Sequence, residues 1–212
     1  MAWRWARAES EIQSVCRQRG ILRARDLDGT GVSRAWLERL VEFRSLVKVG
    51  RGLYALPGHR FSPMAIAAAH APEATLCLLS ALHLHGLLRE PPSHSWFAIH
   101  RNARLPTIDG ACFVRSTGPA LLLGVEPWRV EGVPVRVTSV AKTLVDCFRY
   151  ADRVGEQAGP AALDLAIRTG RCTPMEVLGL ARPCRVWEKL ARRMWSTPAP
   201  ESTEAARTCT GT

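Results

Sequence analysis

The chain has 212 residues, of which 47% are hydrophobic, and a formal net charge of +10. This size suits one large domain or two small ones, each with a real hydrophobic core. Seven isolated cysteines without a Cys-x-x-Cys pair argue against a disulfide framework and a zinc ribbon. No apolar run is long enough to cross a bilayer, and the first residues do not resemble a signal peptide. We therefore expect a reduced, globular, cytoplasmic protein.

The basic balance, with a sequence pI near 10.0, is typical of proteins that bind polyanions such as nucleic acid. Residues 1–60 contain 12 Lys and Arg against 6 acidic residues, while the rest contain 17 against 13. The excess also fits a bias in genome composition, because only three of the 29 basic residues are lysine. Position and motif must therefore decide between these explanations.

The first 57 residues predict a winged helix-turn-helix, in which helices precede a β-hairpin that forms the wing. Gly20 stops the first helix, and Ser33 is placed to cap the last one. The elements expected are a helix over 5–19, an edge strand at 21–22, a short helix over 23–28, a glycine turn at 29–31, a helix over 34–43, and strands 45–49 and 53–56 around Gly50-Arg51-Gly52.

The helix over 34–43 is the predicted recognition helix. We expect Trp36, Leu37, Leu40, Val41 and Phe43 to face the core and the charged residues to face solvent. The start of such a helix meets base edges in the major groove. The predicted DNA-binding residues are Thr30, Ser33, Arg34, Ala35, Glu38, Arg39, Lys48 and Arg51.

These residues are expected to act in different ways. Arg34 and Arg39 can each bond guanine through two donors, whereas Ser33 and Lys48 suit phosphate contacts. Arg51, at the wing tip, could enter the adjacent minor groove. The alternative is a winged helix that makes only protein contacts.

Residues 58–194 predict a second domain of α+β class, so the whole chain is expected to be α+β. Residues 57–60 are the expected linker, and residues 195–212 are expected to be disordered. The elements expected are helices from Ser62 to 71 and over 75–87, strands over 96–99, 112–115, 121–125 and 128–137 with a turn at 131–132, and helices over 139–150, 161–168, from a capping box at Thr173 and Glu176, and over 185–194.

Lys142, Asp146 and Arg149 share one face of the helix over 139–150, because they are four and three residues apart. Such a pair could act as an acid and base couple. Nothing nearby supplies a nucleophile or a phosphate-binding loop, so we interpret the three as a surface ion-pair ladder.

His83 and His85, with Cys77, are candidate metal ligands. The two histidines are two residues apart and so point to different sides of a helix, unlike ligands spaced by four. We expect buried or capping histidines instead, and no metal or cofactor. Trp96 and Trp128 are expected to belong to the core, because no basic residues interleave with them.

Several segments together resemble the AbiEi family, the antitoxins of type IV toxin-antitoxin systems. The segments that carry the resemblance, within residues 15–190, are the winged helix, the wing Val49–Tyr54, the helix Leu78–Leu82 and the stretch Val137–Asp146. The resemblance implies a winged-helix domain that represses its own promoter and a C-terminal domain that opposes a nucleotidyltransferase toxin encoded next to it, without a stable complex. It also implies a regulator that is not an enzyme.

The chain departs from this family at two places. Phe43-Arg44 stands where members usually have Arg-Gly, so we expect the recognition helix to lose its left-handed stop and to end less cleanly. A Ser, Thr and Pro rich tail follows Met194 where the family's helices continue, which puts the antitoxin activity in question.

Two other functions remain open. One is a stand-alone transcription factor whose C-terminal domain senses a ligand or dimerises. The other is a nuclease, which needs a carboxylate on one strand and Glu-x-Lys on the next. Residues 95–137 contain Asp109, Glu126 and Glu131 but no lysine, which argues against a nuclease.

Overall fold

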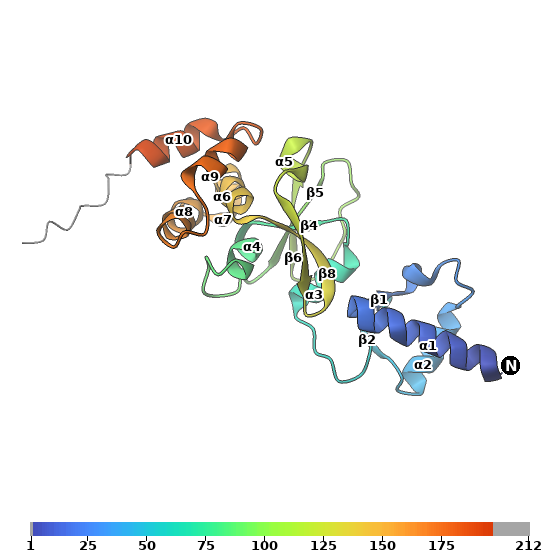
Figure 1. Cartoon of the computed structure of the whole chain (residues 1–212). Coiled ribbons are helices and arrows are strands. Elements are labelled where there is room, and N and C mark those ends of the chain that lie inside the picture. Colours follow the sequence, from blue (N-terminus) through green and yellow to red (C-terminus); the bar gives the residue numbers. More distant parts are fainter. Residues whose placement is uncertain (1, 197–212) are drawn as a thin grey trace, which may run out of the picture.

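A computed structural model describes residues 2–196 of the chain, which form an α+β fold with two sheets (Figure 1). In Figure 1 the molecule is elongated, with the N-terminal sheet and its helices at one end and a group of helices at the other. The larger sheet lies between these ends. Of the tail expected over 195–212, residues 195 and 196 instead end the last helix, and residues 197–212 lie outside the described residues.

The N-terminal part has the order of elements predicted for a winged helix-turn-helix. Its elements are α1 (Ala2–Arg19), β1 (Ile21–Arg23), the 3-10 helix η1 (Ala24–Leu27), α2 (Arg34–Glu42), β2 (Val47–Gly50) and β3 (Leu53–Ala55). The strands are antiparallel in the order β1-β3-β2, so β1 is an edge strand as expected. Only the form of the second helix differs, since it is a single 3-10 turn. Ile12, Cys16, Leu37 and Leu40 belong to the buried core of this part.

The rest of the described chain is built around a mixed five-stranded sheet in the order β6-β5-β4-β8-β7. The β4–β8 and β5–β6 pairs are parallel, and the β4–β5 and β7–β8 pairs are antiparallel. The elements are α3 (Pro63–His70), β4 (Thr75–Leu76), α4 (Leu78–Leu84), β5 (Ser95–His100), β6 (Ala111–Ser116), α5 (Pro119–Leu122), β7 (Val125–Val130), β8 (Val133–Thr138), α6 (Val140–Arg149), α7 (Ala151–Val154), α8 (Ala158–Arg168), α9 (Pro174–Ala181) and α10 (Trp187–Ser196).

Two expected elements are corrected. The segment 75–87 is not one helix, because Thr75 and Leu76 pair with two neighbouring strands and α4 begins only at Leu78, which has a positive φ of 51°. The segment 121–125 is not a strand, because α5 occupies residues 119–122 and β7 begins only at Val125. In both cases a short apolar run fitted helix and strand equally well.

Capping residues define the helix starts that the sequence predicted. The side chains of Ser62, Ser139 and Thr173 accept hydrogen bonds from backbone N–H groups in the first turns of α3, α6 and α9. Thr173 and Glu176 form the expected capping box. Local chemistry therefore sets these boundaries.

Each face of the larger sheet has its own apolar core. One core contains Leu76, Phe97 and Val137 and packs against α3, and the other contains Ala98 and Val114 and packs against α4, α6, α8 and α9. The first core also contains Ile21 and Leu53 of the N-terminal sheet. The two sheets are thus joined through α3 by continuous apolar packing, and not only by the segment 57–60.

Polar and backbone contacts support the same junction. The Arg129 side chain donates to the carbonyl of Gln18 at 2.7 Å. A Cβ placed at Gly20 would lie 3.0 Å from the backbone carbon of Gly132, so the α1–β1 turn touches the β7–β8 turn directly. Only glycine fits so close an approach at a φ of +67°.

Candidate nucleic-acid interface

Helix α2 presents a polar face to solvent, as predicted for a recognition helix. Arg34, Ala35, Glu38 and Arg39 are exposed, and Leu37 and Leu40 are buried on the opposite face. Ser33 occupies the N-cap with an extended backbone, but its side chain makes no capping hydrogen bond. The Ser33 hydroxyl is therefore not used to cap its own helix.

The end of α2 corrects two expectations. Arg44 takes the left-handed conformation with a φ of 58°, so the helix stops there without a glycine. The N–H of Ser45 donates to the Leu40 carbonyl at 2.9 Å, which is the six-residue closure that follows a left-handed stop. Phe43, expected in the core, is 70% exposed, because the backbone turns away from the core at this point.

The turn before α2 is held by its own side chains. The Thr30 hydroxyl donates to the Leu27 carbonyl at 2.7 Å and accepts from the Val32 N–H at 3.4 Å. These bonds give Thr30, predicted to contact DNA, a role in shaping the turn that leads into α2.

The wing is packed against the larger part of the molecule. A Cβ at Gly50 would lie 3.2 Å from Nε2 of His70 and 3.7 Å from the Ile66 side chain, both on α3. Lys48 and Arg51 remain exposed. Helix α3 therefore fixes the position of the wing relative to the sheet.

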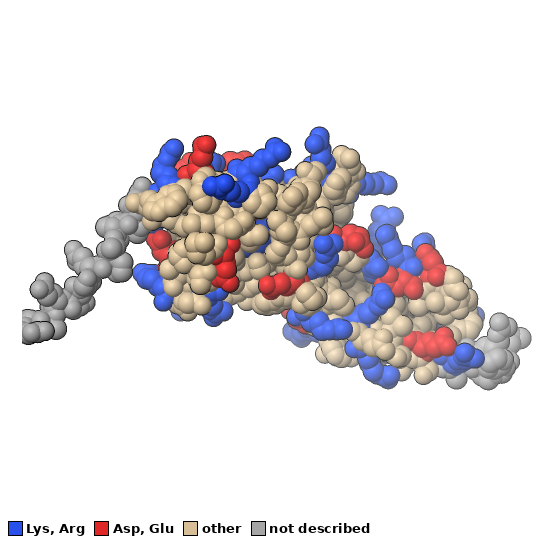
Figure 2. Space-filling model, turned by 45° about the horizontal axis from the view of Figure 1, so that its top comes forward, with Lys and Arg blue, Asp and Glu red and all other residues tan. Residues whose placement is uncertain are grey.

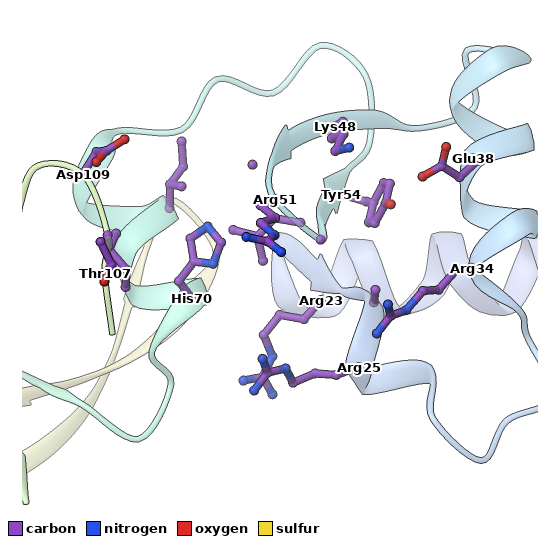
Figure 3. A pocket seen from close by; sticks show the side chains of 16 residues that line it. Arg23, Arg25, Arg34, Glu38, Lys48, Arg51, Tyr54, His70, Thr107 and Asp109 are labelled. Atoms are coloured by element: carbon purple, nitrogen blue, oxygen red, sulfur yellow. The ribbon is translucent and has the colours of Figure 1, made fainter. Parts of the chain in front are cut away.

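A basic cleft lies between α2, the wing, β1–η1 and the larger part of the molecule (Figure 3). Its volume is about 820 Å³. It brings together Arg34, Glu38, Lys48 and Arg51 from the predicted site, whereas Thr30, Ser33, Ala35 and Arg39 do not line it. In Figure 3, Arg51 lies between His70 and the residues of α2.

The structure adds residues that the sequence analysis did not select. Arg23, Arg25 and Tyr54 also line this cleft, with His70 and Asp109 from the larger part. Arg23 and Arg25 lie two residues apart beside an edge strand, a basic spacing that could have indicated them. The contributions of His70 and Asp109 depend on tertiary packing, which no local pattern reveals.

The arginines of the cleft differ in their partners. Arg23 is tied to Asp26 through Nε at 2.9 Å from Oδ1, and Arg19 also reaches that carboxylate, at 3.3 Å. Burial raises the pKa of Asp26, but the hydrogen bonds and charge of Arg23 outweigh it, so the pKa lies below its ordinary value. Among residues 7–195, Arg25, Arg34, Lys48 and Arg51 form no ion pair. Their charges are thus available to an external anion.

Lys142 and Asp146 are not part of a surface ladder. They form an ion pair through both carboxylate oxygens of Asp146 and are only 1% and 4% exposed. Burial is the largest influence on the Asp146 carboxyl and raises its pKa, against the opposing charge and hydrogen bond of Lys142. Arg149 instead donates to the Cys184 carbonyl at 3.4 Å. The pair lies within the apolar core between the sheet and the outer helices.

The two histidines bond backbone carbonyls. His83 Nδ1 lies 3.1 Å from the Leu88 oxygen and the buried His85 Nε2 lies 2.7 Å from the Thr138 oxygen. The His85 ring also meets the Trp128 ring edge-on at 5.1 Å. Within the described part of the chain, His, Cys, Asp and Glu side chains form no group of three that could hold a metal ion.

The carboxylates considered for a nuclease are engaged separately. Glu131 accepts from the Ser62 N–H at 2.6 Å, Glu126 accepts from the Trp128 indole at 3.3 Å, and Asp109 borders the basic cleft.

No helix among residues 2–196 is long and apolar enough to span a membrane.

Comparisons with known proteins agree with the N-terminal assignment. Residues 12–57 match the family described as transcriptional regulator, AbiEi antitoxin, which confirms the resemblance over the winged helix. A crystal structure of the RV2827C protein from Mycobacterium tuberculosis is similar in fold, with a TM-score of 0.55 at 18% identity over 90% of this chain and 76% of that one. A search of curated proteins gives no significant match.

Proposed function

We propose that this chain is an autorepressor that binds duplex DNA at its own promoter and an antitoxin that opposes a nucleotidyltransferase toxin encoded beside it. The match of residues 12–57 to the AbiEi regulators supports the regulatory part. We assign DNA binding to residues 1–57 and antitoxin activity to residues 58–194, in the cytoplasm. No stable complex with the toxin is required.

The observation that carries the DNA-binding proposal is the set of unpaired cations on α2 and the wing. Arg34 on the exposed face of α2 and Arg51 at the wing tip line one cleft, without ion-pair partners among residues 7–195. A recognition helix in the major groove and a wing over the next groove would use such side chains for bases and phosphates.

The proposed roles follow from position. Arg34 and Arg39 would contact base edges, with Ala35 and Glu38 beside them on the same exposed face. Ser33 and Lys48 would contact phosphates, and Arg51 would enter the minor groove. Thr30 would act by holding the turn before α2.

Binding to a duplex that carries the chain's own promoter tests the regulatory part. We expect Arg34→Ala and Arg39→Ala each to cost about 1–3 kcal/mol and to relax base preference, and Arg51→Ala to weaken binding with little change in preference. Arg168→Ala, at an exposed position on α8, is the matched control. Binding without promoter preference or salt dependence would contradict the proposal.

Co-expression with the neighbouring gene product tests the antitoxin part. Growth arrest by that product alone, relieved by this chain, is the expected result. Relief should persist in Arg34→Ala, because the proposal assigns antitoxin activity to another region. A neighbour that is harmless by itself would favour a stand-alone transcription factor.

A further inference from the structure

A second cationic cavity lies beside the cleft described above, on the side of the larger sheet. Its volume is about 570 Å³. Strand β4 has only two residues, Thr75 and Leu76, and lies between β5 and β8 in the sheet. On the N-terminal side of Thr75, therefore, no strand lies between β5 and β8. Ile99 and the segment 71–74 line the cavity at this opening. Arg23, Arg25 and His70 line both hollows, which are therefore neighbours on the surface.

The cavity gathers positive charge from both parts of the molecule. Arg25 comes from η1, Arg104 from the β5–β6 connection and Arg136 from β8. None of these three has an ion-pair partner among residues 7–195, and Glu73 is the carboxylate that lines the cavity. Guanidinium groups around one cavity repel each other, so a bound anion would be stabilised there.

The backbone that carries these arginines is held in place. The Arg115 side chain donates to the carbonyls of Arg101 and, at 3.1 Å, Ala103, which fixes the chain just before Arg104. Arg136 lies in β8 between β4 and β7, opposite Thr75 on one side. A site whose backbone is already ordered loses little entropy when a ligand binds.

We propose that Arg25, Arg104 and Arg136 form a phosphate-binding site, and that its ligand is a DNA backbone phosphate outside the reach of α2 and the wing. The guanidinium fork matches the geometry of phosphate oxygens. The position beside the cleft of the proposed DNA-binding surface, with three lining residues in common, favours a DNA phosphate over a free phosphorylated molecule. The inference rests on the proposed function, and it makes the larger part of the chain a direct contributor to DNA affinity. Figure 2 shows Lys and Arg side chains around the constriction between the two lobes, together with acidic ones.

The first test is the salt dependence of binding to the promoter duplex for the full chain. The logarithm of the binding constant falls linearly with the logarithm of the salt concentration, with a slope of about one for each phosphate contact. We expect Arg104→Gln and Arg136→Gln each to reduce the magnitude of this slope by about one, because each removes one phosphate contact. Base preference should stay unchanged, because phosphates carry no sequence information. Arg168→Gln, remote on α8, is the control of equal charge change. Shortening the duplex by about half a helical turn at a time should lower the affinity of the wild type until it equals that of the double variant Arg104→Gln with Arg136→Gln.

The second test uses inorganic pyrophosphate as a free phosphate probe at constant ionic strength. One outcome is that pyrophosphate raises the melting temperature of the wild type but not that of the double variant Arg104→Gln with Arg136→Gln, while the salt slopes of the variants stay unchanged. This result would keep the site but overturn a DNA phosphate as its ligand. Unchanged slopes without any pyrophosphate effect would overturn the site. A wild type that is protected by pyrophosphate but does not bind the duplex would contradict the proposed function and DNA as the ligand, and would keep the phosphate-binding site itself.

Discussion

Two helices of similar length carry a cation and a carboxylate four residues apart and use them in opposite ways. In α2, Arg34 and Glu38 are both exposed and form no ion pair with each other. In α6, Lys142 and Asp146 are buried and paired. Spacing decides only that two side chains can meet. The neighbouring residues decide whether they do so in water or in a core.

The two pairs differ in what surrounds their helices. Helix α6 carries its charges on one face, but every residue from Ala141 to Phe148 is buried in the fold, including those on that face. The residues of α6 that are buried with the pair are Ala141, Thr143, Leu144, Val145, Cys147 and Phe148. Helix α2 has a polar face that continues from Arg34 through Glu38 to Glu42. A charged pair should therefore be judged by the whole circumference of its helix.

The largest expected effect follows from removing one half of the buried pair. Lys142→Met should lower the free energy of unfolding by about 3–5 kcal/mol, because it leaves the Asp146 carboxylate buried without compensation. The double variant Lys142→Met with Asp146→Leu should recover most of this loss. Urea unfolding of the three proteins measures both values. A loss from Lys142→Met below about 1 kcal/mol would show that the pair is solvated.

The exposed pair should give the reverse result. Arg34→Ala should change the free energy of unfolding by less than about 0.5 kcal/mol, since its side chain is exposed. It should nevertheless reduce promoter binding by roughly ten to a hundred fold, the loss of one base contact. Unfolding and binding measured on the same preparation separate the two effects. A variant that loses stability and affinity together would place Arg34 in the fold and not in the interface.

An intermediate effect is expected at the edge of the proposed DNA-binding surface, where the Asp26 carboxylate forms an ion pair with Arg23. Asp26→Asn should cost about 1–2 kcal/mol, because it weakens hydrogen bonds to a charged partner. The pKa of Asp26 is lowered in the folded state, so its contribution is present above the ordinary value of 3.8 and is lost as pH falls through the lower folded value. The difference between wild type and variant should shrink between pH 6 and strongly acidic pH in urea unfolding. A difference that is constant with pH would contradict this account.

The smallest expected effect is a gain at the end of α2. Arg44→Gly should raise the free energy of unfolding by about 1 kcal/mol, because glycine takes the left-handed conformation without the cost of a Cβ. Arg39→Gly, inside the same helix, is the control and should lower stability by about 1 kcal/mol. If Arg44→Gly is destabilising, the side chain of Arg44 supports the helix end in another way.

The boundaries that were predicted correctly from sequence, in the winged helix and beyond it, are set by local interactions. Gly20 ends α1, Gly50-Arg51-Gly52 closes the wing, and Ser62, Ser139 and Thr173 begin helices through bonds within one turn. Strand β4 was missed because its two residues are defined by partners far along the chain. The left-handed Arg44 was missed because residue type favours glycine there without requiring it.

The candidate site divides in the same way. The exposed residues of α2 and the wing tip follow from helical periodicity and glycine positions, and the structure places four of the eight predicted residues in one cleft. The basic residues at the junction, Arg104 and Arg136, belong to segments that only the tertiary packing brings near Arg25. Local patterns therefore predict which residues of α2 and the wing are exposed, whereas the residues at the junction follow only from the tertiary packing.

The winged helix packs against α3 at two places: Gly50 lies close to His70, and Ile21 and Leu53 share an apolar core with the buried residues of α3. This packing limits how the winged helix can be separated or fused. A fragment that ends at residue 57 would expose the apolar underside of its sheet, so it should be prone to aggregation. A chimera that joins this winged helix to another domain would need a substitute for α3. A reporter fusion should accordingly retain at least residues 1–70. An exchange of the winged helix between relatives should succeed only where α3 is exchanged together with it.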